Sequence, residues 1–315
     1  MYELTSNIII NNEFRFKGVV ECEVASSWEN LTDSCKLTIP RRTEWDGKSV
    51  FVGDSPLIKK DTPLSIAFGL DAKNTQWFKG YVTQIHAGIP TVMDCQDEMW
   101  QLKKGEFTKS YEKVTLKQLL ADMLPKSIKY EVVADYDLGQ WRMTKATPAQ
   151  ILERLNKDYF IRFWFRSQVL YCGLAIIPKL QVTHKIKYII SHQLEYIRKD
   201  DVKLLLKGVI MKPDNKKVEV EVGDTDGEVR TYHKYNISES DMKKFLTQEL
   251  ETLKYDGFRG SFETFIQPNI QHGDIVILPK IYDVEDSGKY IVKKVTKSSR
   301  DKKARQFVEL ERRFG

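Results

Sequence analysis

Hydrophobic and polar residues alternate in short runs over the first hundred residues of the chain. In the run 34–39, every second residue is apolar and these residues share one face of an extended strand, which Pro40 ends because it lacks a backbone donor. A similar run covers 19–24, and polar turn residues separate the two. Several short strands joined by polar loops are typical of a small β-barrel or sandwich. We assign this first β-barrel domain to residues 1–105.

Helical spacing follows the first domain. Thr115 and Gln118 form a capping-box pattern at the start of one predicted helix, and Thr147 gives a second start signal before another apolar stripe. Two apolar runs separated by a short polar turn over 161–173 predict a β-hairpin. The sequence therefore predicts a small α/β module over residues 106–180.

Strand patterns return in residues 181–315, which we assign to a second β-barrel domain with one helix. Valine alternates with glutamate over 218–222, and a turn of Gly and Asp residues predicts that 229–232 pairs back as a hairpin. Ser238 is the predicted N-cap of the helix, and 307–311 is a final alternating strand. The expected fold class is mainly β with an α+β insert, and strands could be exchanged between the parts.

One strand-loop-strand pattern occurs twice in the chain. Asp61 and Asp274 each stand at the start of an apolar strand, and a variable polar loop follows. Gly80 or Gly288 then precedes a second strand that carries a tyrosine. The repeat predicts two similar β-domains. A chain with two such domains and no visible catalytic motif is expected to be a building block rather than an enzyme.

Composition is that of an ordinary globular protein. The chain has 315 residues, of which 41% are hydrophobic and 30% charged, with a formal net charge of +6. Basic residues are spread among 44 acidic ones, so the charge permits a nucleic-acid or acidic partner without arguing for one. We expect no stable membrane insertion, because no stretch approaches the roughly 20 apolar residues that a membrane helix needs. The N-terminal residues show no secretory signal pattern.

Motifs for metal, cofactor or nucleophilic chemistry are missing from the sequence, and we expect no cofactor, no metal and no catalytic residue. The cysteines lack the close spacing of a zinc or redox site, and no two histidines stand three or four residues apart. Phosphate-loop, GxSxG and HExxH patterns are also absent. These cysteines and histidines are Cys22, Cys35, Cys95 and Cys172, and His86, His184, His192, His233 and His272.

Two acidic groups have alternative interpretations. Asp94, Asp97 and Glu98 could form a metal or carboxylate site, but Asp97 and Glu98 also suit the start of a helical turn. Asp224 and Asp226 match part of a calcium loop without the later glutamate, and a hairpin turn explains them more simply.

Aromatic residues gather in the helix-hairpin region. Core packing is the simpler interpretation, although the nearby Arg162 and Arg166 leave open a platform on which nucleic-acid bases stack. The aromatic set is Phe160, Phe163, Trp164, Phe165 and Tyr171.

Several of these segments together resemble phage tail baseplate hub proteins, the family that includes late control gene D-like proteins and the hub part of contractile injection spikes. The resemblance covers most of the chain. It is carried by TPAQIL through VLYCG (147–173), YDGFRGSF (255–262), GDIV (273–276), GKYIV (288–292), and the segments 78–85 and 94–97.

The resemblance implies a homotrimer in which each subunit supplies two similar barrels. Three chains would then present six like domains, a pseudo-sixfold surface that accepts a hexameric tail tube protein. The sequence ends directly after its last strand, so the resemblance implies a separate spike protein. Tape-measure and baseplate wedge proteins are further candidate partners, with DNA only as cargo through the channel. The implied location is the virion tail, or a phage-like particle, after synthesis in the bacterial cytoplasm.

Two other function classes remain open at this point. A nucleic-acid- or carbohydrate-binding β-barrel protein would need basic side chains to converge on one groove if nucleic acid were its ligand. A hydrolase with a site assembled from distant residues would need a cleft that holds a histidine, such as His86 or His272, against a carboxylate.

Overall fold

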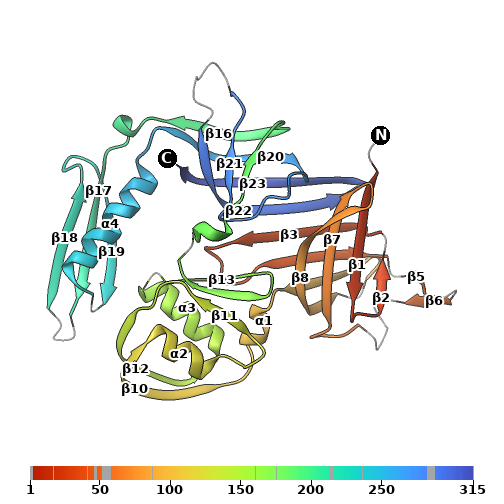
Figure 1. Ribbon diagram of the computed structural model, residues 1–315, viewed down its shortest axis with the longest axis horizontal. Helices are drawn as coiled ribbons and strands as arrows, with labels where there is room; N and C mark the ends of the chain where they lie inside the picture. Colours follow the sequence, from red (N-terminus) through yellow and green to blue (C-terminus); the bar gives the residue numbers. More distant parts are fainter. Residues whose placement is uncertain are drawn as a thin grey trace.

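The computed structural model describes residues 3–16, 18–40, 42–45, 48–51, 58–86, 88–159, 161–174, 176–212, 216–235, 237–281 and 288–314. The fold is mainly β with a small α/β insert, as the sequence predicts. Figure 1 shows the N-terminal strands at the right, the C-terminal strands at the top, the middle module below them, and a small sheet with one helix at the left. Within the described residues, no helix is long and apolar enough to cross a membrane.

The N-terminal strands form what we call the first unit. Their hydrogen-bonded order is β3-β4-β9-β8-β7-β1-β2, and every pair in it is antiparallel. The apolar face of the predicted strand 34–39 is buried in the core of this unit, as its alternation predicts. The strands are β1 (Leu4–Ile10), β2 (Phe14–Phe16), β3 (Glu21–Ser27), β4 (Ser34–Ile39), β7 (Pro63–Leu70), β8 (Lys73–His86) and β9 (Thr91–Gln96), with a separate hairpin of β5 (Arg42–Trp45) and β6 (Lys48–Phe51).

The C-terminal strands form the second unit, with the order β16-β20-β23-β22-β21-β15. This order repeats that of the first unit from β3 to β1, strand for strand and in the same sequence order. The last pair differs, because β1 runs antiparallel to β7 whereas β15 runs parallel to β21. The strands are β15 (Thr183–Lys185), β16 (Ser191–Ile197), β20 (Gly257–Phe265), β21 (Ile275–Ile277), β22 (Lys289–Arg300) and β23 (Lys303–Arg313).

The turn that precedes β7 and β21 shows how closely the two units agree. Asp61 and Gly273 both have a positive φ, of 75° and 82°. Each also donates its backbone N–H to a residue of the long strand, Asp61 to Val82 at 2.8 Å and Gly273 to Val292 at 2.7 Å. The sequence instead aligned Asp61 with Asp274, one residue later. The turn selects residues that tolerate left-handed backbone, which glycine and aspartate both do, so the structural match follows φ rather than the shared carboxylate.

The two units join into one sheet of 13 strands, because β3 of the first unit pairs antiparallel with β22 of the second. The pairing runs from Ser27 opposite Lys294 to Glu21 opposite Arg300. One sheet therefore contains strands from both predicted β-domains. The division of the chain into three domains at residues 105 and 180 stays a prediction.

The middle module and the short helix before it contain three helices and two small sheets. Thr115 and Gln118 form the predicted capping box, and Thr147 makes the equivalent bonds with Gln150. The predicted hairpin over 161–173 is confirmed. The elements are α1 (Met99–Leu102), β10 (Phe107–Thr115), α2 (Leu116–Met123), β11 (Lys129–Val132), β12 (Asp137–Ala146), α3 (Pro148–Tyr159), β13 (Arg162–Arg166), β14 (Val169–Gly173) and the 3-10 turn η1 (Pro178–Leu180).

A three-stranded sheet and one helix are inserted between β16 and β20. Ser238 caps the helix as predicted. The predicted hairpin of 218–222 with 229–232 is wrong, because β17 lies between the two strands and pairs with both. β17 is the most apolar strand of the three, and its central position buries it. The loop after β18 bonds to Leu204, the first residue of β17. The elements are the 3-10 turn η2 (Lys199–Asp201), β17 (Leu204–Met211), β18 (Lys217–Gly223), β19 (Glu228–Tyr235) and α4 (Glu239–Leu253).

Candidate functional site

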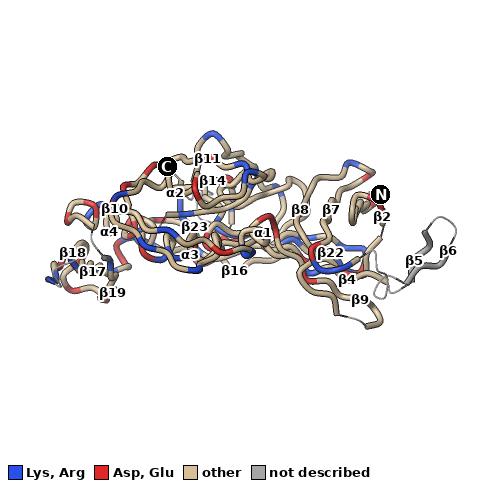
Figure 2. Tube along the Cα trace, turned by 90° about the horizontal axis from the view of Figure 1, so that it is seen from below, with Lys and Arg blue, Asp and Glu red and all other residues tan. Residues whose placement is uncertain are grey.

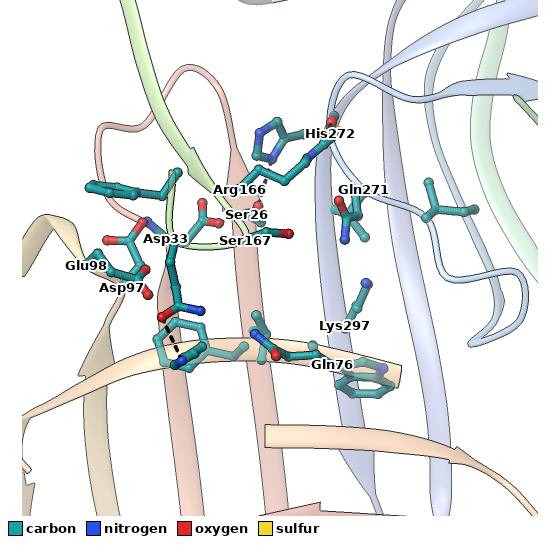
Figure 3. Close-up of a pocket in the computed structure, with 18 residues that line it drawn as sticks. Ser26, Asp33, Gln76, Asp97, Glu98, Arg166, Ser167, Gln271, His272 and Lys297 are labelled. Atoms are coloured by element: carbon teal, nitrogen blue, oxygen red, sulfur yellow. Dashed lines mark hydrogen bonds between the residues drawn. The ribbon is translucent and has the colours of Figure 1, made fainter. Parts of the chain in front are cut away.

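A polar pocket of about 240 Å³ lies where the two units and the middle module meet. The side chains around it come from both ends of the chain and from the β13–β14 hairpin (Figure 3). The charged ones are Asp33, Lys79, Asp97, Glu98, Arg166 and Lys297, with His272 beside them.

Ser26, Asp33 and His272 form a hydrogen-bonded chain in this pocket. The Ser26 Oγ lies 2.6 Å from Asp33 Oδ2 and 2.7 Å from His272 Nδ1. Burial lowers the pKa of His272 to about 3, so the imidazole is neutral at pH 7. When Asp33 is ionised, the single Ser26 hydroxyl proton goes to Asp33, and we assign the proton between Ser26 and His272 to Nδ1, with the imidazole as donor.

This order differs from that of a catalytic triad. In a triad the imidazole lies between the carboxylate and the hydroxyl and accepts the hydroxyl proton. Here the hydroxyl of Ser26 lies in the middle, between the carboxylate of Asp33 and the imidazole of His272. The histidine-carboxylate cleft that a hydrolase needs is therefore not formed by His272. The other candidate, His86, lies 2.7 Å from Asp94 on an exposed strand end.

Two acidic side chains of the pocket, Asp33 and Asp97, accept hydrogen bonds from backbone N–H groups. Burial raises the pKa of Asp33 to about 7 and raises the pKa of Asp97 as well. The carboxylate of Asp97 accepts the N–H of Asp33 at 3.2 Å and the N–H of Met99 at 3.1 Å, so it stands at the start of α1. Asp94 lies apart with His86. The acidic triplet thus does not form one metal site, and no group of three potential metal ligands occurs in the described part of the chain.

Arg166 ties the middle module to the second unit. Its guanidinium donates to the carbonyl of Leu180 at 3.2 Å and to the carbonyl of His272. It also lies 3.8 Å from the carboxylate of Asp274 and 5.1 Å from the ring centre of Trp164. Planar geometry and several fixed donors suit arginine to such a multiple contact. This side chain is largely buried and used within the fold, which argues against a stacking platform for bases.

The aromatic set is largely core. Phe163 is fully buried, and Trp164 and Phe165 are at most 7% exposed. Tyr171 stacks on Trp164 with ring centres 5.0 Å apart. Phe160 lies outside the described residues.

The remaining candidates also have structural surroundings. Asp224 accepts from Lys254 Nζ at 2.5 Å and from the N–H of Leu204 at 3.3 Å, and Asp226 pairs with Lys203, which accounts for both carboxylates of the calcium-like fragment. All four cysteines are buried free thiols. Figure 2 shows basic and acidic residues interspersed along the described trace rather than one basic stretch.

Sequence reasoning missed the contacts that build this pocket. It singled out His272 and Arg166, but not Ser26, Asp33 or Lys297. Ser26 and His272 are 246 positions apart in the chain. Their contact depends on the pairing of β3 with β22, for which neither strand carries a local signal.

Comparison with known proteins finds similarity at the level of structure. No family model matches the sequence, and no curated protein matches it. Among solved structures, a tail protein from Neisseria meningitidis MC58 matches with a TM-score of 0.69 and 13% identity over 98% of this chain and 97% of that one. The 43 kDa tail protein of prophage MuSo2 from Shewanella oneidensis matches with a TM-score of 0.67 and 15% identity over 99% and 97%.

A third structure comes from a secretion machine. It is an E. coli component of the type VI secretion system, itself structurally similar to tail proteins of bacteriophage T4, and it matches with a TM-score of 0.64 and 9% identity over 98% of this chain and 77% of that one. The expected resemblance to tail proteins is confirmed at the level of the fold. This chain therefore has the fold of phage tail proteins and of a related type VI secretion component.

Proposed function

We propose that the chain is a structural hub protein of a phage tail or phage-like contractile injection system, and that it acts without catalysis. Three copies form a ring whose six similar units give pseudo-sixfold symmetry. The ring joins a hexameric tail tube to a separate central spike. DNA would pass through the channel as cargo.

The observation that carries this proposal is the repeat within one chain. Two units have the same strand order and the same positive-φ turn. A closed ring needs heterologous contacts that return to the first subunit. A chain with two equivalent units can supply six equivalent positions from three subunits, which is the number that a sixfold tube presents. The full-length fold similarity to tail proteins supports the same role.

Native mass spectrometry and electron microscopy test the proposal together. We expect a trimer by mass and, in views along the symmetry axis, a ring with six lobes around a central channel. A stable monomer at all concentrations, both alone and after coexpression with the tube and spike proteins of the same gene cluster, would overturn it. Tape-measure and wedge proteins would be tested as further partners by the same coexpression.

A further inference from the structure

We infer that β16 of one copy pairs with the end of β8 of a second copy, and so continues the sheet between chains as β3 and β22 continue it within one chain. This inference rests on the proposed ring, and it names the edges through which the copies meet. The occupant of each edge is a second copy of this chain.

The end of β8 is an open position that is filled in the other unit. In the second unit, one edge of β22 pairs first with β21, up to Ile291, and then with β3, from Lys294 onward. In the first unit, the same edge of β8 pairs with β7 up to Tyr81 and bonds to the turn before β7 at Val82. Among the described residues, 84–86 then pair only with β9, on the other edge. The counterpart of β3 is therefore missing beside β8.

β16 is the strand that corresponds to β3. Both have seven residues. β3 comes after β1, which pairs with β7, and β16 comes after β15, which pairs with β21. β3 lies between β4 and β22, whereas β16 pairs with β20 alone among the described strands and ends the sheet. Figure 1 shows β16 at the upper edge of the C-terminal strands. The free N–H and C=O groups of an unpaired strand edge can pair with another strand, so natural proteins usually cover or protect such an edge.

Both units also share an irregularity that fixes their alignment. The pairing of β8 with β9 shifts register at Thr83, and the pairing of β22 with β23 shifts at Lys293. Each lies directly after the valine that bonds to the positive-φ turn, which aligns Thr83 with Lys293. A β-bulge adds one residue to one strand, so its position sets which residues face each other beyond it.

Rows of paired residues across the two units then align β3 with β16. In the first unit the row is Glu23, Lys36, Asp94 and Gln84. In the second unit the row is Gln193, Ser261, Glu309 and Lys294. Glu23 therefore corresponds to Gln193, and the whole of β3 (21–27) corresponds to β16 (191–197).

This alignment transfers the register of the internal junction to the contact between copies. Ser27 lies opposite Lys294, which places Ile197 opposite Gln84 of the next copy. Ala25 lies opposite Thr296, which places Glu195 opposite His86. Glu195 and His86 are both exposed in the single chain. A carboxylate accepts a hydrogen bond from an imidazole N–H, so Glu195 and His86 form a favourable cross-strand pair.

Each chain thus contributes two different edges to the contacts, the outer edge of β16 and the end of β8. Contacts of this kind are heterologous and propagate until the ring closes. Among the described strands, the end of β8 and the outer edge of β16 are both open, and each copy would use both.

Disulfide cross-linking tests the register with four substitutions in two combinations. The pairs Gln84→Cys with Ile197→Cys, and His86→Cys with Glu195→Cys, are predicted to lie directly opposite, where Cα atoms about 4.5–5.5 Å apart permit a disulfide. The swapped pairs, Gln84→Cys with Glu195→Cys and His86→Cys with Ile197→Cys, are diagonal and about 7–8 Å apart. They serve as matched controls with the same four residues.

We expect oxidation of the opposite pairs to give reducible chains of two and three copies on a denaturing gel, several-fold more than the swapped pairs give. The single variants report any cross-linking through the native buried cysteines. The pair of His86→Cys and Glu195→Cys uses exposed positions, so it keeps the test valid if Ile197→Cys impairs folding.

The outcomes separate this inference from the proposed function. A trimer by native mass in which opposite pairs cross-link no better than swapped pairs overturns the edge pairing and leaves the hub role standing. Opposite pairs that cross-link into a ring of another size support the edge pairing and refute the trimer. A monomer without cross-links overturns both.

Discussion

Replacing His272 should change how the stability of the protein depends on pH. His272 is 2% exposed, and burial together with the charges of Arg166 and Lys297 lowers its pKa from 6.5 to about 3. The folded state therefore keeps the imidazole neutral, while the unfolded chain binds a proton below pH 6.5. A histidine with a lowered folded pKa contributes stability that is present above pH 6.5 and is lost as the pH falls toward 3.

The expected size of this effect follows from linkage. Between pH 7 and pH 5, protonation of an unfolded histidine with a pKa of 6.5 lowers the free energy of unfolding by about 2 kcal/mol. Asp33 acts in the opposite direction, because burial raises its pKa from 3.8 to about 7 and the folded state gains a proton over the same range. The pH profile of the wild type is therefore a sum of opposing contributions, and only a comparison with a variant isolates the histidine.

Urea unfolding of the wild type and of His272→Gln at pH 7 and pH 5 provides that comparison. Glutamine keeps a side-chain donor for Ser26 but does not titrate, so the variant should lose about 2 kcal/mol less than the wild type on going from pH 7 to pH 5. The variant His233→Gln, at an exposed strand position, reports how a histidine substitution by itself affects the measurement. Equal pH dependence in the wild type and in His272→Gln would refute the buried, neutral imidazole.

Three further substitutions test the packing. Gly80→Ala should destabilise the fold by more than about 2 kcal/mol in thermal unfolding, because the new Cβ would lie 2.1 Å from the carbonyl oxygen of Gln96. Gly18→Ala is the control and should change the stability little, because the space around Gly18 is open. Equal unfolding midpoints for the two variants would contradict this. Arg166→Ala should cost about 2–4 kcal/mol and Arg166→Lys should restore only part, since lysine cannot bridge the same carbonyls; full rescue by lysine in urea unfolding would argue against the bridge. Thr115→Ala should cost about 1 kcal/mol by loss of the capping box, measured by urea unfolding, and Thr115→Ser should retain most of the stability.

Most of the local elements discussed above could be predicted from the sequence. Alternation in 34–39, the caps at Thr115 and Ser238, and the hairpin over 161–173 are all present in the structure, because each depends on residues within a few positions of one another. Strand pairing was less accessible. The predicted hairpin after 218–222 failed because the turn pattern does not reveal that β17 occupies the space between the strands.

The candidate site was only partly visible from the chain. His272 and Arg166 were singled out as isolated residues, but their roles depend on partners that no spacing rule connects to them. Asp97 was correctly interpreted as a helix-start residue, since its acceptor role is local. The buried chain through Ser26 could not be predicted, because a strand of the first unit and a loop of the second meet only after the two units have paired.

By itself, the sequence determined that this protein is built of short strands with a helical insert and that one strand-loop-strand unit occurs twice. Periodicity and capping encode which residues are buried and where elements start, and both are local properties. Only the tertiary structure decided the one-residue shift that aligns Asp61 with Gly273, the continuous sheet through β3 and β22, and the unequal edges that this sheet leaves at β8 and β16. Those features depend on which distant strands pack together. The free energy that favours this packing comes from residues throughout the core and not from any one segment of the sequence.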